Sequence, residues 1–211
     1  MLSARQSRVA EAPEAKKSGP AMIAIQKAID GIKDNKADVT EVSLTENVVM
    51  TTAYGIAMAK GLETNTHLKS LTLDSTFQTA DSGTAFGQAL KKNNTLEYLS
   101  LEYNDLGGEA VKVIAEALAT NTGLKELRIN NQKKPIGNEA ERALAEALDK
   151  NTTLCKLSLV VKDTGARGTI DRVLTRNTEL GLFPFLFPLA RNLELQLTVS
   201  PLTLLARTKK K

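Results

Sequence analysis

A short segment in which leucine alternates with polar residues recurs along the chain. It opens on Asn-x-x-Leu in "NTHLKSLTL" from Asn65, "NNTLEYLSL" from Asn93, "NTGLKELRI" from Asn121 and "NTTLCKLSL" from Asn151. A looser copy, "NKADVTEVSL", starts at Asn35. The first apolar positions of the five copies are Val39, Leu68, Leu96, Leu124 and Leu154, at steps of 29, 28, 28 and 30 residues. Five near-equal units predict a repeat array.

Each unit has the pattern of a short strand followed by a helix. Leu99 and Leu101 alternate with Tyr98 and Ser100, and this period of two is typical of a strand with one buried face. Further along, an apolar stripe with helical spacing predicts an amphipathic helix. The stripes are Met22, Ile25, Ile29 and Ile32; Tyr54, Met58 and Leu62; Phe86, Ala89 and Leu90; Val111, Ile114 and Leu118; and Ala140, Leu144 and Leu148.

One such unit cannot bury its own apolar stripe, so the units must stack. The predicted fold is an α/β leucine-rich repeat solenoid, a right-handed αβ horseshoe of the ribonuclease-inhibitor kind with about five repeats over residues 21–180. Parallel strands would line the concave side and helices the convex side. The polar strand positions expected to face the concavity are Glu41, Ser43, Ser70, Thr72, Tyr98, Ser100, Glu126, Arg128, Lys156 and Ser158.

This type of repeat usually carries an asparagine three residues after the last strand leucine. Asn47 and Asn104 occupy that position, whereas the other units have Thr76, Gln132 and Lys162. The asparagine ladder is therefore predicted to be imperfect. A sixth junction, "NTEL" from Asn177, has no matching strand after it.

The two ends fall outside the repeats. Residues 1–20 are small, polar and interrupted by proline, which predicts a flexible leader without the apolar run of a secretory signal. Residues 181–211 form a divergent tail, and "LGLFPFLFPLA" from Leu180 is too short to span a bilayer. Three roles stay open for the tail: a cover on the last repeat, contact with a membrane surface, or disorder. Because proline inside a helix costs about 3 kcal/mol, Pro184 and Pro188 predict that the closing helix stops near Asn177.

Charge and composition exclude several functions. The net charge of +4 comes from the ends, because residues 21–180 carry 19 basic and 21 acidic side chains. A nucleic-acid surface needs clustered positive charge on a folded face. We therefore expect no nucleic-acid partner, and no membrane partner for the array.

Candidate chemistry is equally sparse. Cys155 and His67, the single cysteine and histidine, supply neither a disulfide nor a zinc ligand set. Walker, dinucleotide-binding and nucleophile-elbow motifs are absent from the sequence. The chain is predicted to be a cytoplasmic binding protein and not an enzyme, with no metal and no cofactor; His67 and Cys155 are interpreted as structural residues.

One strand-to-helix loop is longer than the others. The stretch "LKELRINNQKKPIGNEA" from Leu124 begins and ends like "LEYLSLEYNDLGGEA" from Leu96 but contains two extra residues. Insertions in a repeat array lie on one rim, often the binding rim. We expect the insertion to push Lys133 and Lys134 outward, with Pro135 stiffening the return to the helix.

Several segments resemble the C-terminal leucine-rich domain of tropomodulins and leiomodins. They are "ADVTEVSL" from Ala37, "LETNTHLKSLTLDST" from Leu62, "NNTLEYLSLEYNDLGGEA" from Asn93, "LKELRINNQKKPIGNEAERALAEALDKNTTL" from Leu124 and "VVKDTGARGTIDRVLTRNTEL" from Val160. The most specific feature is the fourth strand followed by an Asn-Gln-basic loop, matched by Asn131, Gln132 and Lys133. The resemblance covers roughly residues 22–180.

The resemblance implies a cytoskeletal protein that caps the pointed end of actin filaments or nucleates new ones. By position it nominates loop residues Asp74, Ser75, Thr76, Tyr103, Asn104, Asp105, Asn131, Gln132, Lys133 and Lys134, and closing-helix residues Arg167, Arg172 and Arg176. Tyr98 and Tyr103 are candidate aromatic anchors. We expect actin as the partner of this chain. Tropomyosin is a partner of the family's long N-terminal half, for which residues 1–20 offer no counterpart, so tropomyosin stays an open second partner.

An alternative of another class remains open. A leucine-rich scaffold of the ribonuclease-inhibitor kind would clasp a globular protein other than actin in its concavity. Slower loss of actin from pointed ends would distinguish the first hypothesis from the second.

Overall fold

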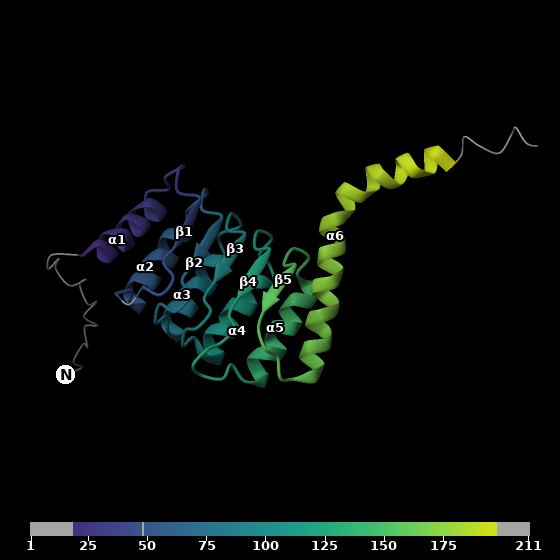
Figure 1. The fold of residues 1–211 in the computed structure, drawn as a ribbon. Coiled ribbons are helices and arrows are strands. Elements are labelled where there is room, and N and C mark those ends of the chain that lie inside the picture. The colour runs from purple at the N-terminus through teal and green to yellow at the C-terminus, as the bar shows by residue number, and fades with distance from the viewer. Residues whose placement is uncertain (1–18, 48, 198–211) are drawn as a thin grey trace, which may run out of the picture.

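The computed structural model describes residues 19–47 and 49–197 and consists of strands and helices in regular alternation (Figure 1). The elements are α1 (Pro20–Lys33), β1 (Glu41–Ser43), α2 (Thr52–Leu62), β2 (Ser70–Thr72), α3 (Ala80–Leu90), β3 (Tyr98–Ser100), α4 (Gly107–Leu118), β4 (Glu126–Arg128), α5 (Asn138–Lys150), β5 (Lys156–Ser158) and α6 (Thr164–Leu197). The predicted strand-then-helix unit is therefore confirmed in every repeat.

The strands form one parallel sheet in chain order, β1-β2-β3-β4-β5. The register aligns equivalent positions of each repeat, so that Leu71 pairs with Leu99 and Leu99 with Leu127. Figure 1 shows the strands in one layer and α1 to α5 in a second layer behind them. This arrangement confirms the leucine-rich repeat solenoid.

The core lies between the strand layer and the helix layer. The central strand leucines Leu71, Leu99 and Leu127 are completely buried, as are Met58 and Ile114 on the helices facing them. Each fully buried side chain of this size contributes about 1.5–3 kcal/mol relative to exposure. The sequence misjudged one strand position: Ser100 is also buried, and its hydroxyl is satisfied by donating to Asp74 Oδ1 of the preceding repeat at 2.5 Å.

A ladder of buried asparagines ties the helix-to-strand junctions together. In Asn121, Nδ2 donates to the carbonyls of Leu90 (2.8 Å) and Asn93 (2.7 Å), while Oδ1 accepts from the amides of Gly123 and Leu124. The same side chain recurs at Asn65, Asn93, Asn151 and Asn177. Each asparagine satisfies backbone groups that the turn would otherwise bury without partners.

The closing helix differs from the prediction. It begins at Thr164 and continues to Leu197, well beyond Asn177. Asn177 nevertheless joins the ladder from within α6, since its Nδ2 donates to the carbonyls of Asn151 and Leu154. Proline removes one helical hydrogen bond, and a helix can accommodate that loss by bending instead of ending. Figure 1 shows α6 changing direction beyond the part that packs on the array.

Most of the predicted leader and the end of the tail lie outside the described residues. Of residues 1–20, the structure describes Gly19 and Pro20, where α1 begins, and residues 198–211 are likewise outside it. No helix within the described part of the chain has the length and apolarity to cross a membrane.

Candidate functional site

The strand-to-helix loops hold a second ladder, formed by residues at the asparagine position of the repeat that the family resemblance also nominated as surface contacts. Asn104 is fully buried; its Oδ1 accepts from the amides of Thr76 (3.1 Å) and Gln78 (3.0 Å), and its Nδ2 donates to the carbonyl of Leu73. Thr76 is also fully buried and donates to the same carbonyl. Gln132 repeats the role one loop later by bridging Leu101 and Leu106. The predicted surface contact by Thr76 and Asn104 is therefore corrected: these side chains hold the loops in place.

The first four loops share an unusual backbone conformation. In each loop the residue three positions after the strand has a left-handed backbone. These residues are Glu46, Ser75, Tyr103 and Asn131, with φ of 55°, 56°, 55° and 55°. Phe77 adds a second left-handed residue, with φ of 58°, to the loop after β2. Left-handed backbone costs an L-residue roughly 1–2 kcal/mol. For bulky side chains such strain is rare and concentrates at functional sites.

Two of these left-handed residues are exposed aromatics. Phe77 is 51% exposed and Tyr103 is 57% exposed, and they project from consecutive loops. Lys133 Nζ, from the third loop in succession, lies 5.1 Å from the centroid of the Phe77 ring. The sequence analysis found Tyr103 and Lys133 but missed Phe77. A large apolar residue directly after the ladder position of a polar loop could have indicated Phe77 from the sequence.

The long loop after β4 is anchored rather than projecting. The amide of Lys133 donates to the carbonyl of Asn104 at 2.8 Å, and Lys134 Nζ lies 3.2 Å from Asp105 Oδ2. A Cβ on residue 108 would lie 2.3 Å from the carbonyl oxygen of Ile136, which is too close, so only glycine fits at Gly108. Both lysines are exposed as expected, but they lie back over the preceding loops instead of pointing away from them.

We call the surface formed by Phe77, Tyr103, Lys133 and Lys134 the loop ridge. The remaining nominated loop residues support it: Asp74 accepts from Ser100 and from the amide of Glu102, Asp105 pairs with Lys134, and Ser75 and Asn131 supply left-handed turns. Aromatic side chains are enriched in protein interfaces and often anchor them, and cations beside them can orient an acidic partner. The geometry therefore suits binding to a macromolecule.

Comparison with known proteins identifies the family. Residues 22–180 match the family model of the TMOD/LMOD leucine-rich domain. The chain belongs to the tropomodulin/leiomodin family. Human leiomodin-2 is 31% identical over 155 residues, which are 74% of this chain and 28% of leiomodin-2, so the chain spans well under half of that relative. The members of this family are not enzymes.

Solved structures give the same result for the fold. The structure titled "Leiomodin-1 Actin-Binding Site 2 (ABS2)" has a TM-score of 0.73 and 29% identity, covering 80% of this chain and 97% of that one. The C-terminal domain of tropomodulin from Caenorhabditis elegans has a TM-score of 0.72 at 18% identity, covering 77% and 98%. At that identity the second likeness concerns the fold alone.

In this tropomodulin/leiomodin domain, the nominated arginines of the closing helix contact the last repeat. Arg167 donates to the carbonyl of Val161, Arg172 Nη2 lies 2.9 Å from Asp149 Oδ1, and Arg176 donates to the carbonyls of Asp149 and Asn151. The contacts with Asp149 and Asn151 hold α6 against the end of α5, whereas Arg167 bonds to the loop that precedes its own helix. Among residues 19–47 and 49–197, no hydrogen bond or ion pair links the three arginines to the loop ridge.

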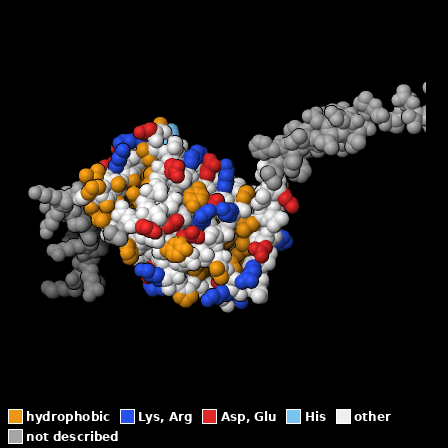
Figure 2. Space-filling view, viewed as in Figure 1, with side chains coloured by type: hydrophobic (Ala, Val, Ile, Leu, Met, Phe, Trp, Pro, Cys, Tyr) orange, Lys and Arg blue, Asp and Glu red, His pale blue; other side chains and the backbone are white. Residues whose placement is uncertain are grey.

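Charged residues on the strands and directly before them pair with one another. The Glu97 carboxylate forms ion pairs with Lys69 (Nζ to Oε1, 3.1 Å) and Lys125 (Nζ to Oε2, 2.6 Å). On β4, Glu126 Oε1 forms ion pairs with Arg128 Nε at 2.6 Å and with Lys156 Nζ at 3.0 Å. The Arg128 guanidinium carbon lies 5.6 Å from the centroid of the Tyr98 ring. Figure 2 shows basic and acidic side chains interspersed over the visible face of the array.

These pairs displace the pKa of both carboxyls. Hydrogen bonds from Lys125 and Lys69 lower the pKa of Glu97. Partial burial of the Glu126 carboxyl opposes ionisation, but hydrogen bonds from Arg128 and Lys156 outweigh it and lower the pKa. A carboxyl whose pKa is lowered by folding stabilises the protein above its unfolded pKa, and that contribution is lost as pH falls through the folded pKa.

The Glu97 cluster therefore makes a pH-dependent prediction. Glu97→Gln should lower the free energy of unfolding at neutral pH by less than about 1 kcal/mol, since the pair is partly exposed. The deficit should shrink as the solution is acidified below the folded pKa. Urea unfolding of both proteins across a pH series measures it, with Glu146→Gln, an exposed helix position, as the control. A deficit that grows in acid would contradict the assignment.

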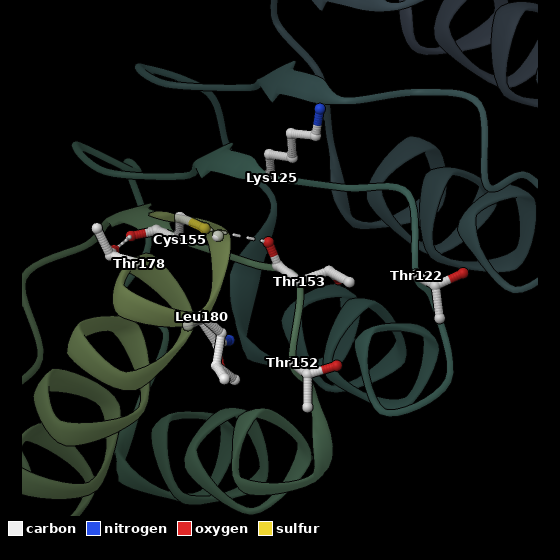
Figure 3. Close-up of a pocket in the computed structure, with 9 residues that line it drawn as sticks. Thr122, Lys125, Thr152, Thr153, Cys155, Thr178 and Leu180 are labelled. Atoms are coloured by element: carbon white, nitrogen blue, oxygen red, sulfur yellow. Dashed lines mark hydrogen bonds between the residues drawn. The ribbon is translucent and has the colours of Figure 1, made fainter. Parts of the chain in front are cut away.

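A pocket of about 510 Å³ lies at the helix-to-strand junctions beside α6 (Figure 3). Lys125, Thr153 and Cys155 line it from the array, and Thr178 and Leu180 line it from α6. The Cys155 thiol is half-buried and donates to the carbonyl of Thr153 at 3.4 Å. This contact agrees with a structural interpretation of Cys155.

Proposed function

We propose that residues 22–180 bind actin through the loop ridge and act at the pointed end of the filament. The carrying observation is that two strained, exposed aromatics and two lysines from three consecutive loops form one surface. The likeness to the leiomodin-1 structure titled as an actin-binding site supports actin as the partner. The proposed location is the cytoplasmic actin cytoskeleton.

The pairing of charges favours the ridge over the concavity as the binding surface. A scaffold that clasped a partner in its concavity would have to separate Glu97 and Glu126 from their cations or bind around them. On the ridge, Lys133 contacts a ring rather than an acid, so its charge is available to an acidic surface. Such charges supply orientation and association rate more than affinity.

The direct test uses filaments of pyrene-labelled actin capped by gelsolin, so that subunits leave from the pointed end alone. We expect the protein to slow depolymerisation at micromolar concentration. Bare filaments and tropomyosin-coated filaments should be compared, and similar protection of both would indicate that the repeat domain acts without tropomyosin. Unchanged depolymerisation on both would refute the proposal and favour a partner other than actin.

Reversing the ridge charge should weaken binding without unfolding the array. Lys133→Glu combined with Lys134→Glu removes the contact with Phe77 and sets a carboxylate beside Asp105. We expect about a ten-fold loss of protection, on the order of 1–2 kcal/mol. Lys27→Glu combined with Lys60→Glu makes the same charge change on exposed positions of α1 and α2. An equal loss in both double variants would mean that net charge, not the ridge, is responsible.

A further inference from the structure

A second pocket, of about 390 Å³, separates the loop after β4 from the loop after β5. Its walls include Ile136, Leu159 and Val160, and Val160 is 61% exposed. Lys134 and Lys162 also line it, together with the carboxyl-bearing Glu141. The pocket is thus partly apolar and partly charged.

The pocket occurs where the ladder between loops is interrupted. Asn104 ties the loop after β3 to the loop after β2, and Gln132 ties the next pair. The equivalent residue of the fifth loop, Lys162, has no acceptor atom and is exposed. Glu141 of α5 replaces it by accepting from the amides of Lys162 (2.9 Å) and Asp163 (2.7 Å). The fourth and fifth loops are therefore held separately, and the pocket opens between them.

Two amides of the loop after β4 have no hydrogen bond to any described residue. In the loop after β2, the amides four and six residues beyond the strand, those of Thr76 and Gln78, donate to Asn104 Oδ1. The corresponding amides in the loop after β4 belong to Gln132 and Lys134, and within residues 19–47 and 49–197 neither one has an acceptor. The amides of Gln132 and Lys134 therefore lack an oxygen acceptor such as the one that Asn104 Oδ1 provides for the loop after β2.

We propose that this pocket receives an aspartate or glutamate side chain of a partner protein. The carboxylate would accept from the amides of Gln132 and Lys134 and meet the ammonium groups at positions 134 and 162. A neighbouring apolar residue of the partner would pack on Leu159 and Val160.

The charges facing the pocket are consistent with an anionic occupant. Lys134 already forms an ion pair with Asp105, whereas Lys162 has no ion pair within the described residues. The negative charge of Glu141 is already stabilised by two amides at the start of α6, where the helix dipole also favours it. The inference does not require the partner to be actin.

The test follows backbone amides by NMR in the ¹⁵N-labelled protein. The probe is the peptide acetyl-Leu-Asp-Leu-amide, and acetyl-Leu-Lys-Leu-amide is its matched control. At millimolar concentration the aspartate peptide should shift the amide resonances of Gln132 and Lys134 downfield in a saturable manner. Shifts of equal size with both peptides, or no shift at these two amides, would overturn the proposal.

Two substitutions at one position separate charge from shape. Lys162→Asn places a carboxamide at the ladder position, as in the loop containing Asn104, and should close the pocket, raise the Tm and abolish the peptide shifts. Lys162→Ala removes the charge and leaves the pocket open, so the peptide should bind about five-fold more weakly. Unaltered peptide binding by the Lys162→Asn protein would also overturn the proposal.

Discussion

Replacing Asn121 by alanine should lower the free energy of unfolding by roughly 3–5 kcal/mol, the largest effect that we expect from any single polar substitution. Asn121 is 3% exposed and makes four hydrogen bonds to backbone groups of two repeats. The alanine variant would leave two carbonyls and two amides buried without partners. Each such group costs about 1–3 kcal/mol, and partial relaxation of the turn keeps the total below the sum.

Urea unfolding followed by circular dichroism measures the effect as a lower midpoint. Asn138→Ala is the matched control, because Asn138 is exposed and its side chain bonds to no described residue. We expect its midpoint to change little. Similar midpoints for the Asn121 variant and the wild type would show that the ladder is dispensable. A change in the slope as well as the midpoint would indicate that the end repeats separate from the centre, as a repeat array allows.

The repeat structure could be predicted because each unit places the same residue types in the same environment. The leucines at alternate strand positions are buried wherever they recur, since each strand pairs in register with the next. The junction asparagines bond to the preceding repeat in the same way each time. A period near 28 residues therefore carries both the fold and its main polar contacts.

The candidate site was less predictable because it depends on contacts between repeats that differ. The path of the long loop is set by the carbonyl of Asn104 and the space above Gly108, which lie about one repeat earlier in the chain. At Asn104 the repeat position indicated a ladder asparagine, which its complete burial bears out, whereas the family resemblance nominated it as a surface contact. Left-handed backbone usually indicates glycine or asparagine, so nothing in the sequence indicated it for Phe77.

The closing helix shows the limit of a local rule. The cost of proline correctly implies a disturbance near Pro184, but a cost does not determine whether a helix ends or bends. Here the helix continues to Leu197, and Asp149 and Asn151 hold it through Arg172 and Arg176.

Glycine at the two ridge aromatics should abolish most actin binding while leaving the fold intact. In Phe77→Gly combined with Tyr103→Gly, both backbones keep their φ near 58° and 55° without the penalty of a Cβ. Relief of that strain offsets the lost packing and the lost contact with Lys133, so the stability should change by no more than about 1 kcal/mol. Loss of two aromatic anchors should weaken binding about thirty-fold or more, which corresponds to roughly 2 kcal/mol or above.

The comparison of stability with binding is what identifies a functional role. If the strained aromatics served the fold, the double glycine variant would unfold at lower urea and bind actin in proportion to its folded fraction. If they serve binding, the double glycine variant will unfold at the same urea concentration as the wild type but will protect pointed ends less. Glu46→Gly relieves the same left-handed strain on the loop after β1, away from the ridge, and should gain stability with unchanged protection. Retained protection in the folded double variant would show that the aromatics are not the anchors and would move the contact to other loops.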